Sequence, residues 1–381
     1  MRAVSVSDYR EIARRKLPKI FFEYIDGGSY AEATLGRNVA DIEAIALRQL
    51  VMRDMSVLDM STTSLGQSFS MPLGISPVGM SGMYGRRGEV QGARAAAKAG
   101  IPFSLSTVGV CPVEEVAAAG VPPWFQLYIL KDRGYTRALI ERAKAAGSPV
   151  LFLTVDLPMP GARYRDVRSG FTGATGLGAA IERAWDGISH PAWMWDVWLH
   201  GRPHTMGSIA GAIEGRGSVS DVLTWIAKNF DRSVTWADVD WVRQVWDGPI
   251  VIKGVLDPED ARQAVKAGAQ GVVVSNHGGR QLDGVRSSIS ALPGIADAVG
   301  GDLEVYMDGG VRSGLDVLKA VALGAKACFI GRPWAYALAA GGEAAVARML
   351  ETFRAELAVA MTLTGCSTIA QAGRSLLDTD A

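Results

Sequence analysis

One histidine stands in a segment suited to proton transfer. His277 lies in NHGGRQLD directly after an apolar run, and the glycines that follow it let the backbone pass close to a ligand. Arg280 comes three residues later, within reach of an anionic substrate. Histidine titrates near neutral pH and is the usual general base, and Asp156, which follows another apolar run, is a candidate to orient its ring. The segment predicts proton abstraction from an anionic substrate.

The other three histidines are poor candidates for chemistry. His200 and His204 have helical spacing, but Gly201 and Pro203 between them argue against a helix and so against a two-histidine metal face. We expect these two and His190 to be surface or interface residues, and we expect no metal site.

Two further cationic residues, Arg163 and Lys253, lie near the ends of apolar runs. Arg163, in PGARYRD, supplies a second guanidinium, and two arginines near a histidine suit a carboxylate held by paired hydrogen bonds. A solvated loop is the alternative for Arg163 and Arg165. Lys253 ends an apolar run, where an unpaired buried charge would cost roughly several kcal/mol, so we expect it to serve the site.

Two glycine- and arginine-containing segments are typical of phosphate binding. They are DGGVRSG at 308–314 and IGRP at 330–333, each after an apolar run. Backbone N–H groups at Gly309 and Gly310, a helix start near Ser313, and Arg332 would together receive a dianion.

A recurring pattern indicates the elements that position these residues. Alanine-rich amphipathic segments end at Gly100, Gly147, Gly268 and Gly324, and a short apolar run follows each. Four more runs, at 73–76, 124–128, 250–253 and 303–307, bring the number of expected strands to eight. Eight βα units predict an α/β fold, a (β/α)8 (TIM) barrel, with reactive groups at the carboxyl ends of the strands. A doubly wound nucleotide-binding sheet is less well supported, because no G-x-G-x-x-G follows the first strand.

We expect a single domain over residues 1–381, with two regions outside the eight repeated units. Residues 1–70 contain candidate helices at 7–15, 18–25 and 38–46 and would form an N-terminal helical cover on the barrel of 71–381. Residues 160–240 form an insertion after the fourth strand. Four tryptophans fall within 185–198, in a stretch too irregular for one amphipathic helix, and 218–247 has the pattern of two helical segments.

Composition narrows the class of protein. Lys and Arg equal Asp and Glu at 39 each, which gives no general attraction for nucleic acid. The three cysteines lie far apart with no C-x-x-C pair, so neither a disulfide framework nor a thiolate zinc site is expected. The N-terminus lacks the features of a signal peptide, and no run of about 18 apolar residues occurs. These features predict a cytoplasmic protein.

Taken together, the motifs resemble the FMN-dependent L-2-hydroxy-acid oxidising family, which includes glycolate oxidase, lactate oxidase and mandelate dehydrogenase. The similarity covers nearly the whole chain and is most specific in SNHGGRQLD at 275–283 and DGGVRSG at 308–314. It includes YIDGG, SPVG, WFQLY and GARYRD. The segments GMYGRRGEVQ and MTLTG are most similar to the quinone-linked L-lactate dehydrogenases of that family.

The resemblance implies a role for each site residue. His277 would be the base paired with Asp156, Arg163 and Arg280 would hold the substrate carboxylate, and Tyr24 and Tyr128 would contact the substrate oxygens. Gln126, Thr154 and Ser106 would contact the flavin ring, with Lys253 near N1 and O2. The complete set of residues implied for FMN is Pro77, Val78, Gly79, Ser106, Gln126, Thr154, Lys253, Ser275, Asp308, Gly309, Gly310, Arg312, Gly331 and Arg332.

One departure and one shared feature bear on how the flavin would behave. Ser76 stands where close relatives carry alanine, which puts flavin tuning in question but not the chemistry. Gly79 stands where many oxidases of the family carry alanine, which favours a dehydrogenase. Whether the base takes the hydroxyl proton or the α-proton stays open, as does mandelate or glycolate as the substrate, since Val108 and Pro160 are candidates to line its pocket.

Oxidation of L-lactate with a quinone as the acceptor has three alternatives. An oxygen-using oxidase stays open. A flavin-binding scaffold leaves the base and both arginines unexplained, and an FMN-dependent isomerase would need a metal-binding carboxylate cluster. The resemblance implies a homo-oligomer, a tetramer, placed peripherally on the cytoplasmic face of the inner membrane. The aromatic stretch within 177–215 either meets the membrane surface or packs on the barrel or a neighbouring subunit.

Overall fold

Eight parallel strands form one barrel in the computed structural model of the chain, which describes residues 2–173, 176–212, 225 and 228–378. Their order around the barrel is β3-β10-β9-β8-β7-β6-β5-β4, and a bridge between Ile75 and Phe103 joins the two ends. The predicted (β/α)8 barrel is confirmed. The strands are β3 (Leu73–Ile75), β4 (Ser104–Ser106), β5 (Trp124–Leu127), β6 (Leu151–Thr154), β7 (Ile250–Val255), β8 (Gly271–Val274), β9 (Glu304–Asp308) and β10 (Ala327–Ile330).

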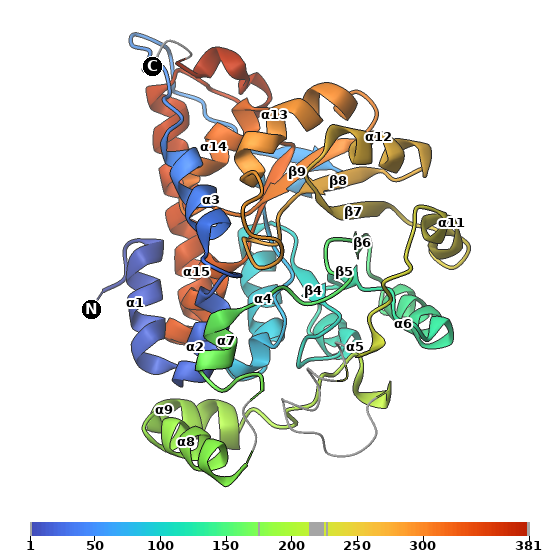
Figure 1. Cartoon of the computed structure of the whole chain (residues 1–381). Coiled ribbons are helices and arrows are strands. Elements are labelled where there is room, and N and C mark those ends of the chain that lie inside the picture. Colours follow the sequence, from blue (N-terminus) through green and yellow to red (C-terminus); the bar gives the residue numbers. More distant parts are fainter. Residues whose placement is uncertain (1, 174–175, 213–224, 226–227, 379–381) are drawn as a thin grey trace.

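Helices between the strands surround the barrel (Figure 1). The four glycines predicted to stop helices, at 100, 147, 268 and 324, all have positive φ, between 68° and 107°. Glycine adopts this left-handed conformation without the steric cost of a side chain, so each helix stops where the next strand must begin. The helices are α4 (Gly88–Ala99), α5 (Val113–Ala118), α6 (Arg133–Ala145), α11 (Ala237–Arg243), α12 (Pro258–Lys266), α13 (Ser288–Val299), α14 (Gly314–Ala322) and α15 (Arg332–Leu363).

Aromatic side chains fill the barrel interior below the carboxyl ends of the strands. Trp124, Phe152, Tyr306 and Phe329 are fully buried against one another, and the Phe152 and Phe329 rings lie 5.1 Å apart at 71°. A hairpin of β1 (Thr62–Ser64) and β2 (Gln67–Phe69), which the sequence analysis did not predict, places Phe69 against this cluster. The packed interior gives the site a rigid floor.

The N-terminal segment lies over the side of the barrel. Its helices are α1 (Val6–Lys16), α2 (Lys19–Asp26) and α3 (Ala33–Glu43). The first two match the predicted ranges to within a residue, whereas α3 begins five residues earlier than predicted. Helix α1 packs against helix α15, so segments far apart in the sequence lie side by side (Figure 1).

The buried carboxylate of Asp26 connects the N-terminal helices to the insertion and to α15. Asp26, at the end of α2, accepts hydrogen bonds from Arg10 of α1, from Arg165 and from Tyr336 of α15. The Arg165 Nη1–Asp26 Oδ2 distance is 2.7 Å and the Tyr336 Oη–Asp26 Oδ1 distance is 2.6 Å. Burial would raise the pKa of Asp26, but the two arginines and the tyrosine outweigh it, so the pKa is lowered and the carboxylate is charged.

The segment between β6 and β7 carries the insertion. Helix α7 (Tyr164–Arg168) packs on α2, and α8 (Leu177–Ile188), α9 (Pro191–Trp193), the π-helix η2 (Met194–Leu199) and the short 3-10 helix η3 (Ala210–Ala212) follow. Helices α8 and α9 project from the barrel below α2 (Figure 1). Of the two helical segments predicted at 218–247, α11 is present, and most of the other lies outside the described residues. Among the described residues, no helix has the length and apolar character to cross a membrane.

Candidate active site

His277 and Asp156 form a hydrogen-bonded pair at the carboxyl ends of β8 and β6. The His277 Nδ1–Asp156 Oδ1 distance is 2.9 Å, and Ser275 Oγ accepts a hydrogen bond from the His277 backbone N–H. Because a carboxylate can only accept, Nδ1 carries the proton and Nε2 keeps a lone pair. Burial lowers the pKa of His277, and Asp156 offsets this only in part. The imidazole is therefore neutral at neutral pH and able to take a proton.

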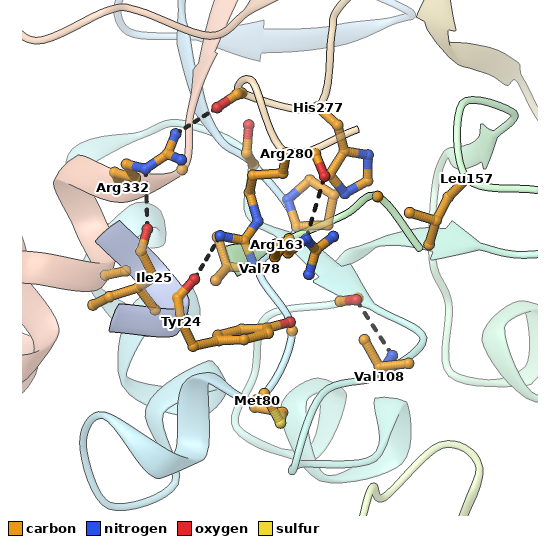
Figure 2. Close-up of a pocket in the computed structure, with 18 of the residues that line it drawn as sticks. Tyr24, Ile25, Val78, Met80, Val108, Leu157, Arg163, His277, Arg280 and Arg332 are labelled. Carbon is orange, nitrogen blue, oxygen red and sulfur yellow. Dashed lines mark hydrogen bonds between the residues drawn. The ribbon is translucent and has the colours of Figure 1, made fainter. Parts of the chain in front are cut away.

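Two guanidinium groups share the cavity with His277. Figure 2 shows Arg163, Arg280 and His277 gathered around it, with the Tyr24 side chain at its edge. Arg163 Nε donates to the Arg280 carbonyl oxygen at 3.2 Å, and Arg280 Nη1 donates to the backbone oxygens of Tyr24 and Gly27. The Arg280 guanidinium also lies 4.7 Å from the centre of the Tyr24 ring.

The two guanidiniums attract an anion because nearby carboxylates do not neutralise them. The nearest acid to Arg163 is Asp166, at 3.9 Å, and burial together with the charge of Arg280 lowers the pKa of Arg163. Burial likewise raises the pKa of Asp166. A substrate carboxylate would relieve the repulsion between the arginines, which fits the predicted substrate-binding pair.

Tyr128 contributes a buried hydroxyl to the same cavity. Its side chain packs on Phe230, with ring centres 4.7 Å apart, and burial raises its pKa. The phenol stays protonated and can donate a hydrogen bond to a substrate oxygen.

Lys253 is buried in β7, two residues before the strand ends, and is charged. Its Nζ lies 2.9 Å from Asp308 Oδ2 and 3.0 Å from Ser275 Oγ. Burial would lower the pKa of Lys253, but Asp308 and Asp156 outweigh it, so the pKa is raised. The lysine is thus paired, and it links the loop after β8, through Ser275, to the end of β9.

Several buried polar atoms at this end of the barrel have no partner among the described residues. They are Ser76 Oγ, Gln126 Nε2, Thr154 Oγ1, Asp156 Oδ2 and Asp308 Oδ1. Buried polar groups are normally hydrogen-bonded, and two of these residues, Ser76 and Asp308, line the cavity, which indicates that a polar ligand completes them. Unsatisfied donors and acceptors on adjacent strands suit the heteroatom edge of a flavin ring.

The opposite end of the cavity suits a phosphate. Gly309 and Gly310 have φ of 92° and 90° and expose their backbone, and a side chain at Gly310 would lie 1.9 Å from the Asn38 oxygen. Burial lowers the pKa of Arg312, and it lowers that of Arg332 to about 10. Arg332 donates to the carbonyl oxygens of Ile25, Gly278 and Gly27, so the backbone fixes its position (Figure 2).

One cavity of about 510 Å³ brings most of the predicted residues together. Those lining it are Tyr24, Pro77, Val78, Gly79, Ser106, Tyr128, Arg163, Lys253, His277, Arg280, Asp308, Gly309, Gly310, Arg312, Gly331 and Arg332, and also Val108 and Pro160. Asp156, Gln126, Thr154 and Ser275 lie behind this lining. Asp156 contacts His277, Gln126 accepts from the Ser106 hydroxyl, Ser275 contacts Lys253, and Thr154 pairs in register with Lys253.

Sequence reasoning missed several lining residues. Asp166, Phe171, Met206 and Phe230 reach the cavity from the insertion. Asp166 lies inside the quoted GARYRD segment, which was a usable signal. The other three follow no pattern, since their position depends on how the insertion folds back onto the barrel.

The remaining histidines lie away from the cavity. His200 Nδ1 and His204 Nε2 contact backbone oxygens of Trp195 and Trp198, and His190 Nδ1 contacts that of Asp186. No group of three metal-ligating side chains occurs in the part of the chain that the structure describes.

Comparison with known proteins identifies the class. Residues 13–379 match the family described as FMN-dependent dehydrogenase. The chain is 55% identical to an L-lactate dehydrogenase from Chromohalobacter salexigens over 98% of this chain and 95% of that protein. Among solved structures, a monotopic membrane (S)-mandelate dehydrogenase superposes with a TM-score of 0.92 at 32% identity over the full length of both chains. A mandelate oxidase superposes with a TM-score of 0.84 at 38% identity, over 99% of this chain and 98% of that one.

The chain belongs to the FMN-dependent dehydrogenase family. It is accordingly an FMN-dependent oxidoreductase that acts on a CH–OH group, and the predicted family, cofactor and class of enzyme are confirmed.

Proposed function

We propose that the protein oxidises an (S)-2-hydroxy acid, L-lactate in the first place, to the 2-oxo acid, pyruvate, and that the two electrons pass from the flavin to a quinone. The observation that carries the proposal is the neutral His277, oriented by Asp156, in one cavity with Arg163 and Arg280. L-lactate is supported by the relative of that activity at 55% identity.

The residues assign a part to each group of the substrate. The carboxylate would lie against the two guanidiniums, the hydroxyl oxygen would accept from Tyr128 or Tyr24, and the carbon that carries it would face His277 Nε2. His277 takes one proton, from the hydroxyl or from the α-carbon, and the adjacent Asp156 carboxylate stabilises the imidazolium that forms. Bound FMN supplies the two-electron acceptor, held by Lys253, Gln126, Thr154 and Ser106 at its ring and by residues 308–332 at its phosphate.

His277→Gln tests the assignment of the base. The variant should bind FMN like the parent, since His277 contacts no phosphate-binding residue, but anaerobic bleaching of the flavin by L-lactate should slow by roughly 10²–10⁴-fold or more. Normal bleaching would refute the assignment. His204→Gln is the matched control and should bleach at the parental rate, because His204 lies outside the cavity.

An oxygen-using oxidase is the second candidate, and Gly79 disfavours it. Gly79 lines the cavity, and a Cβ there would lie 2.8 Å from Val108 Cγ2, so a larger residue would displace Val108. Oxygen consumption with L-lactate, compared with reduction of a soluble quinone analogue, separates the two functions. Mandelate and glycolate in the same assay define the preferred substrate.

Peripheral attachment to the cytoplasmic face of the inner membrane, as a homotetramer, is part of the same proposal. The solved (S)-mandelate dehydrogenase, a monotopic membrane protein, supports attachment without a spanning helix. The insertion supplies the surface, since the side chains of Trp185 and Trp195 are 72% and 65% exposed. Indole rings are favoured at the membrane interface.

A further inference from the structure

A second cavity, of about 680 Å³, lies between the barrel and the insertion. Its lining comes from Lys16 and Leu17 at the end of α1, from part of the segment 84–94 before and within α4, from Glu115, and from parts of the segments 192–197 (α9 and η2) and 338–343 (α15). It shares none of its lining residues with the substrate cavity. Tyr84 marks the boundary, since it lines the second cavity and donates a hydrogen bond to the Gly79 oxygen at 2.9 Å.

Four cations line this second cavity, and two of them have no carboxylate partner. Arg87 pairs with Glu115, and Arg86 lies 3.5 Å from Asp196 of the insertion. The lining also contains a third acid, Glu343, whose charge is paired with Lys98, a residue outside the lining, at 2.5 Å.

Lys16 and Arg94 supply the surplus charge. Lys16 Nζ donates to the Ala340 backbone oxygen, and Arg94 has no hydrogen bond or ion pair with any other described residue. The cavity thus offers two positive charges and several spare donor hydrogens to an anion.

The part of the insertion that lines the cavity, α9 and η2, also carries an exposed apolar surface. Trp193 and Val197 turn inward and are buried, and Trp193 Nε1 donates to the Met83 oxygen at 2.8 Å. Trp195 and Trp198, on the same short helical segment, turn outward and are exposed, as are side chains of α8. An amphiphile whose chains lie along the exposed rings would therefore hold its polar end near the cavity.

We propose that this cavity binds the phosphate group of an anionic phospholipid headgroup. The assignment rests on the proposed attachment to a membrane, and it adds a specific lipid contact to it. The unpaired charges of Lys16 and Arg94 favour an anionic ligand. The adjacent indole rings favour an amphiphile as the molecule that carries the anion. The arginines that the resemblance assigns to the FMN phosphate, Arg312 and Arg332, line the other cavity, so the second cavity is free for this ligand.

Vesicle flotation of the FMN-loaded protein tests the proposal. The parent is compared with Lys16→Gln/Arg94→Gln on vesicles of phosphatidylcholine alone and of phosphatidylcholine with phosphatidylglycerol. The matched control, Arg262→Gln/Lys266→Gln, removes two exposed charges from α12, on the opposite side of the barrel from α8 and α9 (Figure 1). A cation near an anionic surface contributes about fivefold in affinity, so the cavity variant should lose roughly 25-fold on the anionic vesicles. The control should lose less than about twofold, and all three proteins should bind neutral vesicles equally.

The remaining outcomes separate the two proposals. If the parent binds neither vesicle, membrane attachment itself is wrong. If the parent binds anionic vesicles and the cavity variant binds as well, attachment stands and the headgroup site is refuted. Equal losses in the cavity and control variants also refute it, since they indicate general charge. Calorimetry with glycerol phosphate tests a soluble ligand. If glycerol phosphate binds the parent but not the Lys16→Gln/Arg94→Gln variant, and the parent shows no preference for anionic vesicles, the lipid proposal is refuted and the ligand is a free phosphate ester.

Discussion

The backbone of His277 lies in the left-handed region, with φ of 57°. This conformation costs a residue other than glycine steric strain. Hydrogen bonds on both sides maintain it: Ser275 Oγ accepts from its N–H, and Asp156 holds its ring. Gly278 and Gly279 continue the same conformation at φ of 65° and 73°. The strain lies at the residue that we propose as the base, where a fixed ring direction is needed most.

The pH dependence of flavin reduction should reflect the lowered pKa of His277. Only the neutral imidazole accepts a proton, and burial lowers its pKa below the usual 6.5. The rate of anaerobic reduction by L-lactate should therefore be constant above about pH 6.5 and fall about tenfold per unit below the pKa. Rapid-mixing spectroscopy across this range checks it, and a rate that still rises between about pH 7 and 9 would contradict it.

Asp156→Asn should move the profile in a defined direction. The carboxylate raises the His277 pKa against burial, so its loss should shift the acid limb to lower pH. The plateau should also fall, by roughly 10²-fold or more, because the amide no longer fixes the tautomer or stabilises the imidazolium. An acid limb that moves to higher pH would show that Asp156 does not act on His277 in this way.

Ser76 lines the cavity with a buried hydroxyl that has no partner among the described residues. We expect it to hydrogen-bond FMN, so Ser76→Ala should weaken FMN binding about three- to tenfold. Titration of the apoprotein with FMN, followed by fluorescence quenching, measures this. Ser148→Ala is the control, since Ser148 Oγ is equally unpartnered but lies outside the cavity. Equal affinities for parent and Ser76→Ala would show that the hydroxyl faces away from the flavin.

At the scale of elements, predictability follows local pattern. Four strand–helix boundaries could be predicted because Gly100, Gly147, Gly268 and Gly324 are local backbone requirements. The polar residues ending buried strands, such as Thr154 and Lys253, could be placed at one end of the barrel for the same reason. The hairpin at 62–69 and the contacts of Phe230 could not, because each depends on a partner far away in the chain.

Asp26→Asn should destabilise the fold strongly, because it leaves Arg10, Arg165 and Tyr336 without their shared charge. Breaking a buried ion pair costs about 3–5 kcal/mol, so the thermal midpoint should fall by several degrees. Differential scanning fluorimetry of the FMN-loaded protein measures it. Glu11→Gln is the matched control, since Glu11 also bridges two arginines but on the surface, where solvent screens the ion pairs and the midpoint should barely change. Equal midpoints for the two variants would mean that the Asp26 cluster is as weak as a surface pair.

The same substitution should reach the active site through α7. Arg165 lies two residues from Arg163, and the substitution removes the shortest of its three ion pairs while leaving those with Glu23 and Glu32, so the loop that carries the proposed substrate arginine is held less firmly. The KM for L-lactate should rise severalfold while the fraction of bound FMN stays unchanged. A rise in KM without any change in FMN content would separate this effect from general unfolding.

At the scale of the whole molecule, α8 and α9 of the insertion project from the barrel and η2 carries exposed indole rings (Figure 1). The double variant Trp195→Ser/Trp198→Ser should move most of the protein from sedimented membranes to the supernatant, because the proposed attachment depends on the exposed rings. Val51→Ser/Met52→Ser, which also removes two exposed apolar side chains, is the control and should leave sedimentation unchanged. If both variants sediment like the parent, the insertion is not the membrane surface.

The pairing of α1 with α15 has a consequence for how the chain matures on the ribosome. Val6, Tyr9, Ala13 and Leu17 are buried largely because residues 332–363 lie against them, and those residues are synthesised only after all eight barrel strands. At ordinary rates of elongation the N-terminal helix waits on the order of tens of seconds for its partner, with its apolar face uncovered. Asp26 meets Tyr336 only after that interval, and Arg165 is fixed with it. The first helix of a nascent chain therefore keeps an uncovered apolar face until residues 332–363 have been synthesised, and we expect chaperones that bind apolar segments to recognise it in that interval.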